Sequence, residues 1–399
     1  MVREMDFVDE CYADKDLSLL KKLTLVIPTY NRNYYLSRCL WYHAHFPFGQ
    51  IIVADSSPEE KKVVNRETVA KVRETFGADI LYLEYEPEME KYGGDIYRKW
   101  GDAVMHVGTA YSQICTDKEF VIPTSLVKCS YFLQNHPEYE FSDGCIYNII
   151  NSAGEYKLKE RYPHRNPPKS NNPIKRFFIS TTQTPVWNNT LLFSLYRAET
   201  MKEVYSTLWD YDINDIRYGE LALGYFGHFL GMDNYEKTMC FKCRDEINID
   251  VQRKEINASH SSESSSSRYI LMDRYDSDDF TRKTSENFMR CIRDNINASN
   301  DDNSKYLDSL LFNTKTWIRY NGEKGMKYSK IWYQSKIIRK IYNHLPQMVA
   351  SIINKTAFKI FGYSIPAQEI SPFASKEIET ILQCIYDTQE FQNQDKTII

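Results

Sequence analysis

The sequence lacks an apolar run long enough to cross a membrane. Its best apolar stretch, Met348 to Phe361, is short and carries Lys355 and Lys359. The first residues, MVREMDFVDECYADKD, are acidic and have no apolar core, so neither a signal peptide nor a membrane anchor is expected there. We therefore expect a protein that works in the cytoplasm.

An excess of charge of one sign is also missing, as is a dense set of cysteines. The formal net charge of −4 excludes the strongly basic composition of a general nucleic-acid-binding protein. Nine cysteines, an odd number, are spread from Cys11 to Cys384, unlike the even cluster of a small secreted domain. Cys240 and Cys243 form a lone C-x-x-C without a second pair, which indicates buried thiols and not a zinc site.

The chain is long enough for a large core. Its 399 residues are 42% hydrophobic and 26% charged, which suits two units at roughly 100 to 200 residues per domain. We expect a polar lead-in over 1–22, a unit of alternating strands and helices over 23–250, and a helical region over 251–399 that begins with the Ser-rich loop SHSSESSSS.

An apolar run that breaks abruptly into polar residues opens the second of these segments. Leu23 to Arg32 reads LTLVIPTYNR. Apolar runs without alternation are typical of parallel strands covered on both faces, and such sheets hold their ligands at the carboxyl ends of the strands. We therefore expect a ligand to lie against the residues that end this strand, which are Pro28, Thr29, Tyr30, Asn31 and Arg32.

The same pattern returns in the next strand. Ile51 to Ala54 is again apolar and is followed by Asp55 and Ser56. Between the two runs, residues 34–45 place apolar side chains on one helical face, which predicts a right-handed strand-helix-strand unit. Both strands then deliver polar groups to one edge of the sheet.

A third strand is expected to end at an acidic triplet. The segment YSQICTDKEFVIP, 111–123, places Asp117, Lys118 and Glu119 between two apolar runs. Two carboxylates two residues apart point the same way if the segment is extended. A divalent ion would then bridge them to a diphosphate, unless Lys118 neutralises the phosphate itself as a point charge.

In this order, the three strand ends resemble the amino-terminal part of the family-2-like glycosyltransferases with a GT-A fold. The resemblance covers residues 23–230 and implies an α/β fold with a Rossmann-like mixed, mainly parallel sheet flanked by helices, followed here by a helical carboxyl-terminal region. It implies transfer of a sugar from a nucleotide-sugar donor to a glycan or lipid-linked glycan acceptor, as in bacterial surface polysaccharide synthesis.

The resemblance also implies roles for the residues. The first loop would border the nucleotide, and Asp55 and Ser56 would meet the base or ribose. Asp117 and Lys118 would lie at the diphosphate, and Asp117 and Glu119 would hold Mn²⁺ or Mg²⁺ as a variant of the family's D-x-D motif.

A helix is predicted over 95–107, after Gly93 and Gly94. Glycines at that point let the backbone approach a ligand closely. Arg98 and Lys99 lie one turn into this helix, where they reach a phosphate or remain surface charges.

The segment WDYDINDIRYGELALGYFGHFL resembles the place where the family carries its catalytic base. Asp215 and Glu220 are the candidates, with Asp212 behind them. An inverting transfer needs one carboxylate within hydrogen-bond reach of the acceptor hydroxyl. The alternatives are structural, because Asp215 would cap the helix and Glu220 would pair with Arg217.

Two other functions stay open. A sugar nucleotidyltransferase uses a similar sheet, although it normally opens with a Gly-rich phosphate loop and residues 28–32 contain no glycine. The other is a catalytically silent nucleotide- or glycan-binding protein that kept the fold, which the altered triplet at 117–119 favours.

A basic amphipathic stretch, 327–360, combines lysines and arginines with Ile, Trp and Tyr. Such a segment either lies in the headgroup region of an anionic membrane or packs as a core helix with a solvated basic face. The first alternative predicts peripheral contact with the inner face of the membrane.

Overall fold

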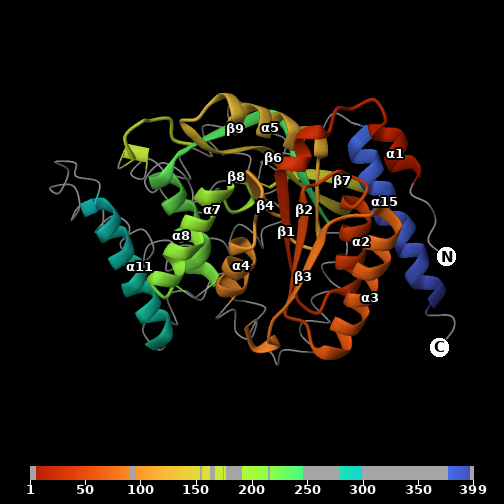
Figure 1. Cartoon of the computed structure of the whole chain (residues 1–399), viewed down its shortest axis with the longest axis horizontal. Coiled ribbons are helices and arrows are strands. Elements are labelled where there is room, and N and C mark those ends of the chain that lie inside the picture. The colour runs from red at the N-terminus through yellow and green to blue at the C-terminus, as the bar shows by residue number, and fades with distance from the viewer. Residues whose placement is uncertain are drawn as a thin grey trace, which may run out of the picture.

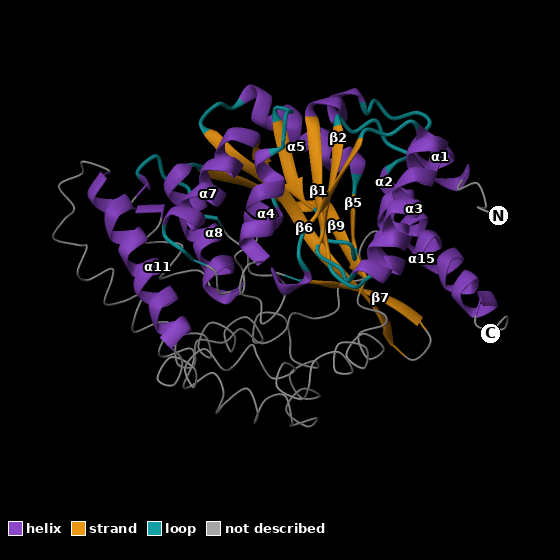
Figure 2. Ribbon diagram, turned by 60° about the horizontal axis from the view of Figure 1, so that its bottom comes forward, coloured by secondary structure: helices purple, strands orange, loops and turns teal. Residues whose placement is uncertain are grey.

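The computed structural model describes residues 6–89, 96–152, 155–161, 167–173, 175–176, 191–213, 216–245, 279–298 and 376–395. In these ranges a nine-stranded mixed sheet forms the centre, with helices on both of its faces (Figures 1 and 2). Most of its paired residues are parallel. The predicted α/β class is confirmed, whereas the basic stretch 327–360 lies outside the described residues.

The predicted ligand-binding half is a parallel sheet of four strands. Their order across the sheet is β3 (Ile80–Glu84), β2 (Gln50–Asp55), β1 (Leu23–Thr29) and β4 (Tyr111–Ile114). Helices connect them in sequence, namely α2 (Asn33–His43), α3 (Glu59–Phe76) and α4 (Ile96–Met105). Gly77 ends α3 in the left-handed conformation, with φ of 64°, where a side chain would be strained.

Helices cover both faces of β1 and β2, which explains their continuous apolar runs. Leu25 and Ile27 belong to the core on the side of α2 and α3. Val26 and Ile52 belong to the core on the opposite side, with α4. Successive side chains of a strand point to opposite faces, so a strand buried on both sides needs apolar residues at every position.

The other half of the sheet is mixed. It contains β8 (Leu195–Arg197), β6 (Tyr139–Ser152), β9 (Met232–Asp245) and β5 (Glu119–Val121), with β7 (Glu155–Glu160) paired to β6. The long strands β6 and β9 run parallel with register shifts, and β9 also pairs antiparallel with the short β5. Thus β9 runs beside the strand that begins at Glu119, the last residue of the predicted acidic triplet.

The remaining helices pack on these two layers. Pro123 at the first helical position begins α5, where its missing N–H is not needed. The set comprises α1 (Asp6–Tyr12), η1 (Ser18–Lys22), α5 (Pro123–Asn135), η4 (Leu191–Phe193), α7 (Ala198–Asp210), α8 (Ile216–Leu230) and α11 (Asp279–Ala298). In Figure 1, α4, α7, α8 and α11 lie on one side of β1, and α2, α3 and α1 lie on the other.

The last described helix, α15 (Lys376–Asp395), returns to the first half of the chain. It lies beside α1 and α2 in both views (Figures 1 and 2), and Ile378, Ile381 and Ile385 join the same core as Leu36 of α2. Glu377 accepts a hydrogen bond from Thr124 Oγ1. This part of the predicted helical region is therefore built into the core of the strand-rich unit.

Ile381→Ala is expected to lower the free energy of unfolding by about 3 kcal/mol, because the fully buried side chain would leave a cavity. Urea unfolding monitored by circular dichroism measures the change. Gln383→Ala, on the exposed side of the same helix, is the control and should change stability by less than about 0.5 kcal/mol. Equal stability of Ile381→Ala and the control would show that α15 does not complete this core.

Candidate functional site

Hydrogen bonds connect the residues at the carboxyl ends of β1, β2 and β4. Thr29 ends β1 and donates its hydroxyl to Asp117 Oδ2 at 2.8 Å. The backbone N–H of Ser56, just after β2, donates to Thr29 O at 3.3 Å. Residues from three distant parts of the chain therefore share one edge of the sheet, which we call the strand-end site. This is the edge at which open α/β sheets hold ligands.

The residues of the predicted loop after β1 differ in how deeply they are buried at this site. Pro28 is buried within β1, Tyr30 is half-buried and Asn31 is exposed. Asn31 has a φ of 54°, a left-handed conformation that asparagine tolerates better than most residues, and its N–H donates to Ser57 Oγ at 2.8 Å. The loop thus turns sharply and presents Asn31 to solvent.

Arg32 contacts Asp117, in the segment that follows β4. Its Nη1 donates to Asp117 Oδ1 at 3.2 Å, with the arginine side chain 33% exposed and that of Asp117 only 1%. Together with the Thr29 bond, this occupies both oxygens of Asp117. The structure therefore brings three of the predicted residues into direct contact.

Asp55 is fully buried and cross-links three elements. Its Oδ1 accepts the N–H of Ser57 at 2.8 Å, and its Oδ2 accepts Asn65 Nδ2 at 2.7 Å and the Tyr82 hydroxyl at 2.5 Å. Burial and the bond to Asp55 raise the pKa of Tyr82, so its hydroxyl remains a donor. A carboxylate has about four lone-pair directions, so these three donors leave one of them unused.

Lys99 and Arg98 are neighbours on α4, but their side chains contact different parts of the protein. Lys99 is buried and donates to Ser56 Oγ at 2.8 Å and to Thr29 O at 3.2 Å, which brings a cation into the strand-end site. Arg98 is exposed and donates to Asp212 Oδ1 at 2.9 Å. Of the pair, the structure places Lys99 at the predicted phosphate edge.

The acidic triplet is not extended, contrary to the prediction. The N–H of Glu119 donates to Thr116 O at 2.8 Å, so Asp117 and Lys118 are the central residues of a turn, and β5 begins only at Glu119. The alternation that would point two carboxylates the same way does not apply within a turn. That geometric basis for a metal site shared by Asp117 and Glu119 is therefore wrong.

Glu119 is bound by cations of β9. Its Oε2 accepts Lys242 Nζ at 3.0 Å and the N–H of Thr116 at 2.9 Å, and its Oε1 accepts Arg244 Nη1 at 3.3 Å. Burial opposes ionisation of Glu119, but Lys242 and Arg244 outweigh it and hold the pKa of Glu119 below its usual value. Glu119 is thus a buried carboxylate with two cationic partners.

A second buried ion pair adjoins the turn. Arg38 Nη2 donates to Asp245 Oδ2 at 2.7 Å, with both side chains fully buried, and the N–H of Asp245 donates to Lys118 O at 3.0 Å. Lys118 is 5% exposed, and its Nζ lies 5.9 Å from the centre of the Tyr35 ring.

The sequence reasoning missed Arg38, Lys242, Arg244 and Asp245. One signal was present in FKCRD, 241–245, where two cations alternate with buried residues and an aspartate ends the strand, as Asp55 ends β2. The pairing of β9 with β5 was needed to bring these residues beside Glu119.

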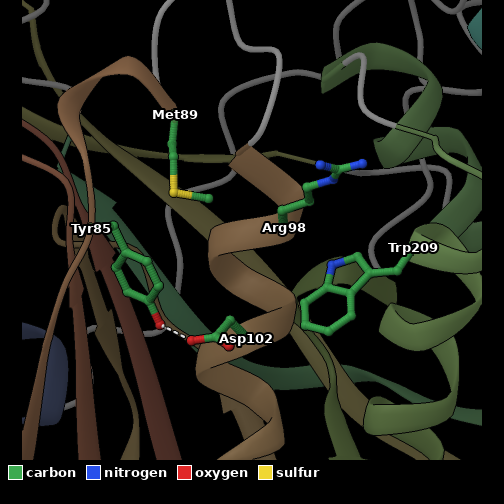
Figure 3. Close-up of a pocket in the computed structure, with 5 residues that line it drawn as sticks. All are labelled: Tyr85, Met89, Arg98, Asp102 and Trp209. Atoms are coloured by element: carbon green, nitrogen blue, oxygen red, sulfur yellow. Dashed lines mark hydrogen bonds between the residues drawn. The ribbon is translucent and has the colours of Figure 1, made fainter.

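A cavity of about 490 Å³ opens between β3, α4 and α7 (Figure 3). Arg98 and Asp102 extend from α4, with Tyr85 and Met89 on one side and Trp209 on the other. The Tyr85 hydroxyl donates to Asp102 Oδ2 at 2.7 Å. The N–H of Tyr85 donates to Asp55 O at 2.8 Å, which connects the cavity to the strand-end site.

Of the three acidic residues considered as the catalytic base, the structure describes the side chain of Asp212. Asp215 lies outside the described residues, and Glu220 is within α8 but its side chain is not described. Asp212 is described, with Arg98 Nη2 at 2.9 Å from one carboxylate oxygen and Lys283 Nζ at 3.3 Å from the other. Both oxygens of Asp212 therefore have cationic partners.

A buried Cys-His-Cys group consists of Cys39 and His43 of α2 and of Cys115, which follows β4. The N–H of Val121 donates to His43 Nε2 at 3.3 Å, which leaves Nδ1 to donate to Cys39 O at 2.8 Å. Both ring nitrogens are thus engaged, so the group does not offer the imidazole lone pair that a metal needs. None of the described cysteines forms a disulfide, and the sulfur atoms of Cys240 and Cys243 lie 3.9 Å apart.

No helix among the described residues has the length and apolar character to span a membrane.

No protein-family model and no curated protein matches the sequence. Solved structures do match. S. aureus TarS 1-349 in complex with UDP-GlcNAc is 12% identical, with a TM-score of 0.43 over 94% of this chain and 92% of that chain. S. aureus TarS 1-349 alone is 13% identical, with a TM-score of 0.37 over 77% of this chain and 91% of that one. S. aureus TarS is 15% identical, with a TM-score of 0.36 over 76% of this chain and 55% of that chain. At these identities and TM-scores the likeness is distant.

Proposed function

We propose that this chain is a glycosyltransferase that moves a sugar from a nucleotide-sugar donor to a glycan or lipid-linked glycan acceptor. The main support is the strand-end site, where Thr29, Arg32 and Asp117 are in contact at the carboxyl edge of a parallel sheet. Buried Lys99 adds a cation there, which suits a phosphate-bearing ligand. Synthesis of bacterial surface polysaccharide, at the cytoplasmic face of the membrane, is the setting we propose.

The donor would lie along the strand ends. Asp55, together with Ser56, is assigned to the nucleoside, because the loop after β2 lies beside Thr29 and the cavity. The diphosphate is assigned to the edge formed by Arg32 and the 117–118 turn. Such positioning holds the leaving group while the acceptor approaches.

The cavity beside α4 is assigned to a sugar ring. Tyr85 and Trp209 offer aromatic faces, and Arg98 and Asp102 offer hydrogen-bonding groups. Sugars present apolar C–H faces and polar hydroxyls, so this combination of side chains suits them.

The proton of the acceptor hydroxyl would pass to a carboxylate of the 212–220 segment in an inverting transfer. We assign this role to Asp215 and Glu220 and not to Asp212, since both oxygens of Asp212 already have cationic partners. The acceptor oxygen forms the new bond to the anomeric carbon, and the nucleoside diphosphate leaves with the electron pair of the broken bond.

The proposal is tested by calorimetric titration with UDP, GDP, ADP, CDP and TDP, followed by hydrolysis assays with the corresponding sugar nucleotides. Asp55→Asn is expected to weaken nucleoside diphosphate binding by about tenfold with little change in kcat, because one charged hydrogen-bond acceptor is lost. Lys128→Ala, at an exposed position of α5, is the control and should bind as the wild type does.

Three other outcomes would replace the proposal. Absence of binding to every nucleotide would reject it. Binding without turnover would favour a silent binding protein, and turnover of a nucleoside triphosphate with a sugar phosphate would favour a nucleotidyltransferase.

A further inference from the structure

The contacts around the 117–118 turn bear on how the charge of the donor is neutralised, a question that rests on the proposed function. The fold family implies a divalent ion held by the carboxylates of the acidic triplet. We infer instead that cationic side chains, chiefly Arg32, Lys118 and Arg244, neutralise the donor diphosphate, and that binding of the nucleotide needs no divalent ion.

The two carboxylates of the triplet do not fit a shared metal ion. Asp117 accepts from Thr29 on one oxygen and pairs with Arg32 on the other, and its side chain is 1% exposed. Glu119, equally buried, has Lys242 on one oxygen and Arg244 on the other. A divalent ion between them would lie beside cations already bonded to each of its ligands, and like charges repel strongly in a poorly solvated site.

The turn also separates the two side chains along the backbone. Asp117 belongs to the loop that ends β4, whereas Glu119 is the first residue of β5 and faces the cations of β9. Mg²⁺ and Mn²⁺ need closely spaced oxygens around one point. A carboxylate pair divided between two sets of cations does not offer that arrangement.

Charge in the same region favours an anion. Among the described residues, the ion pairs around the turn, taken with Lys118, comprise five cationic side chains and three carboxylates, namely Arg32, Arg38, Lys118, Lys242 and Arg244 against Asp117, Glu119 and Asp245. The diphosphate of a sugar nucleotide is dianionic, so it would offset this excess of positive charge. The protein would then supply the charge that a metal supplies elsewhere.

Hydrogen-bond donors in this region point the same way. Arg38 Nε and Nη1 and the hydroxyl oxygens of Tyr34 and Thr116 are buried and have no hydrogen-bond partner within the described part of the chain. Each of these groups can donate a hydrogen bond, and buried polar groups normally have partners. An anion, directly or through water, satisfies donors, whereas a metal ion does not.

Exposure decides which cations meet the diphosphate. Lys242 is fully buried on Glu119 and stays there, whereas the Arg32 side chain is 33% exposed and that of Arg244 is 17% exposed. Exposure does not select Lys118, which is 5% exposed; it is chosen because it stands at the turn itself, between the two carboxylates of the triplet. We therefore assign Arg32 and Lys118 to the phosphates, with Arg244 at the side of Glu119.

The experiment compares nucleotide binding with and without divalent ions. The nucleoside diphosphate of the panel that binds most tightly is titrated calorimetrically into the full chain, in excess EDTA, in MnCl₂ and in MgCl₂. We expect dissociation constants that agree within about twofold across the three buffers, because the protein's own cations neutralise the ligand.

Two variants test the assigned residues in EDTA. Lys118→Met keeps the length and packing of the side chain on Tyr35 but removes its charge, and Arg32→Gln keeps a donor for Asp117. Each is expected to weaken nucleoside diphosphate binding by about tenfold, the effect of one lost charged contact. Lys128→Ala removes an exposed lysine of α5 and should leave binding within about twofold of the wild type.

The outcomes separate this inference from the proposed function. Binding that appears only with Mn²⁺ or Mg²⁺ would overturn metal-independent neutralisation and leave the nucleotide site intact. Wild-type affinity of both Lys118→Met and Arg32→Gln would overturn the assignment of the cations. If no nucleoside diphosphate binds in any buffer, the proposed function fails, and this inference fails with it.

Discussion

Asp245→Ala is expected to lower the free energy of unfolding by about 3–5 kcal/mol, the usual cost of leaving one partner of a buried ion pair without the other. Arg38 and Asp245 are both fully buried and lie 2.7 Å apart. The rings of Tyr34, Tyr35 and Phe120 lie about 5 Å from the Arg38 guanidinium, so loss of the carboxylate leaves a buried charge among aromatic side chains. Urea unfolding at neutral pH measures the loss.

Two further variants show whether burial causes this effect. Glu199→Ala removes the acid of an exposed pair with Lys202, in which Glu199 is 87% exposed, and should cost less than about 1 kcal/mol. The double variant Arg38→Met with Asp245→Leu removes both charges and should recover most of the stability lost in Asp245→Ala. A loss below about 1 kcal/mol in Asp245→Ala would contradict the buried pair.

Glu119→Gln is expected to destabilise the protein by about 3 kcal/mol, because Lys242 would keep a buried charge without an anionic partner. Lys242 is fully buried, and its Nζ would retain only uncharged partners, namely Ile114 O at 2.9 Å, the Phe193 ring at 4.8 Å and the new amide. The substitution preserves the shape of the side chain. Thermal and urea unfolding at neutral pH measure the change, and unaltered stability would show that Lys242 does not depend on Glu119.

The same residue gives stability a defined dependence on pH. Lys242 and Arg244 hold the pKa of Glu119 below its ordinary value of 4.5 despite burial. A carboxyl with a lowered folded-state pKa stabilises the protein above the unfolded-state pKa, and this contribution is lost as the pH falls through the folded-state pKa. Below pH 4.5 the wild type should therefore lose stability more steeply than Glu119→Gln. Parallel curves for the two proteins would contradict the ion pair.

The sequence predicted the first half of the sheet well. Leu23–Thr29 and Ile51–Asp55 are recognisable because both faces of these strands are buried, so Thr24 is the one polar residue before the strand ends. The places of Thr29, Arg32 and Asp117 at a common edge follow from the parallel order of the strands. Local pattern was sufficient because helices connect neighbouring strands in sequence.

The second half could not be predicted in the same way. The β6 strand, YEFSDGCIYNIINS, mixes polar and apolar residues, and its parallel partner β9 follows about ninety residues later in the chain. No local sequence pattern indicates which strands pair when they lie so far apart in the chain. For that reason Arg38, Lys242, Arg244 and Asp245 were not placed, although they surround the predicted triplet.

The acidic triplet does not follow the alternation of side chains that holds along a strand. Side chains two residues apart share a face only in a strand, and Asp117 lies in a turn that closes between Thr116 and Glu119. A polar T-D-K sequence favours such a turn, since aspartate and threonine bond readily to nearby backbone groups. The turn propensity of residues 116–118 therefore indicates the observed structure better than the spacing of the two carboxylates does.

The position of α15 has a consequence for how the protein is made. Its isoleucines fill a core that otherwise consists of residues from the first 160, Leu195 of β8 and the β9 strand. Domains usually fold on the ribosome in order of synthesis, as soon as their residues have emerged. Here the layer around α1 and α2 must wait, partly uncovered, until residues 376–395 have left the exit tunnel, so early chains are expected to need chaperones.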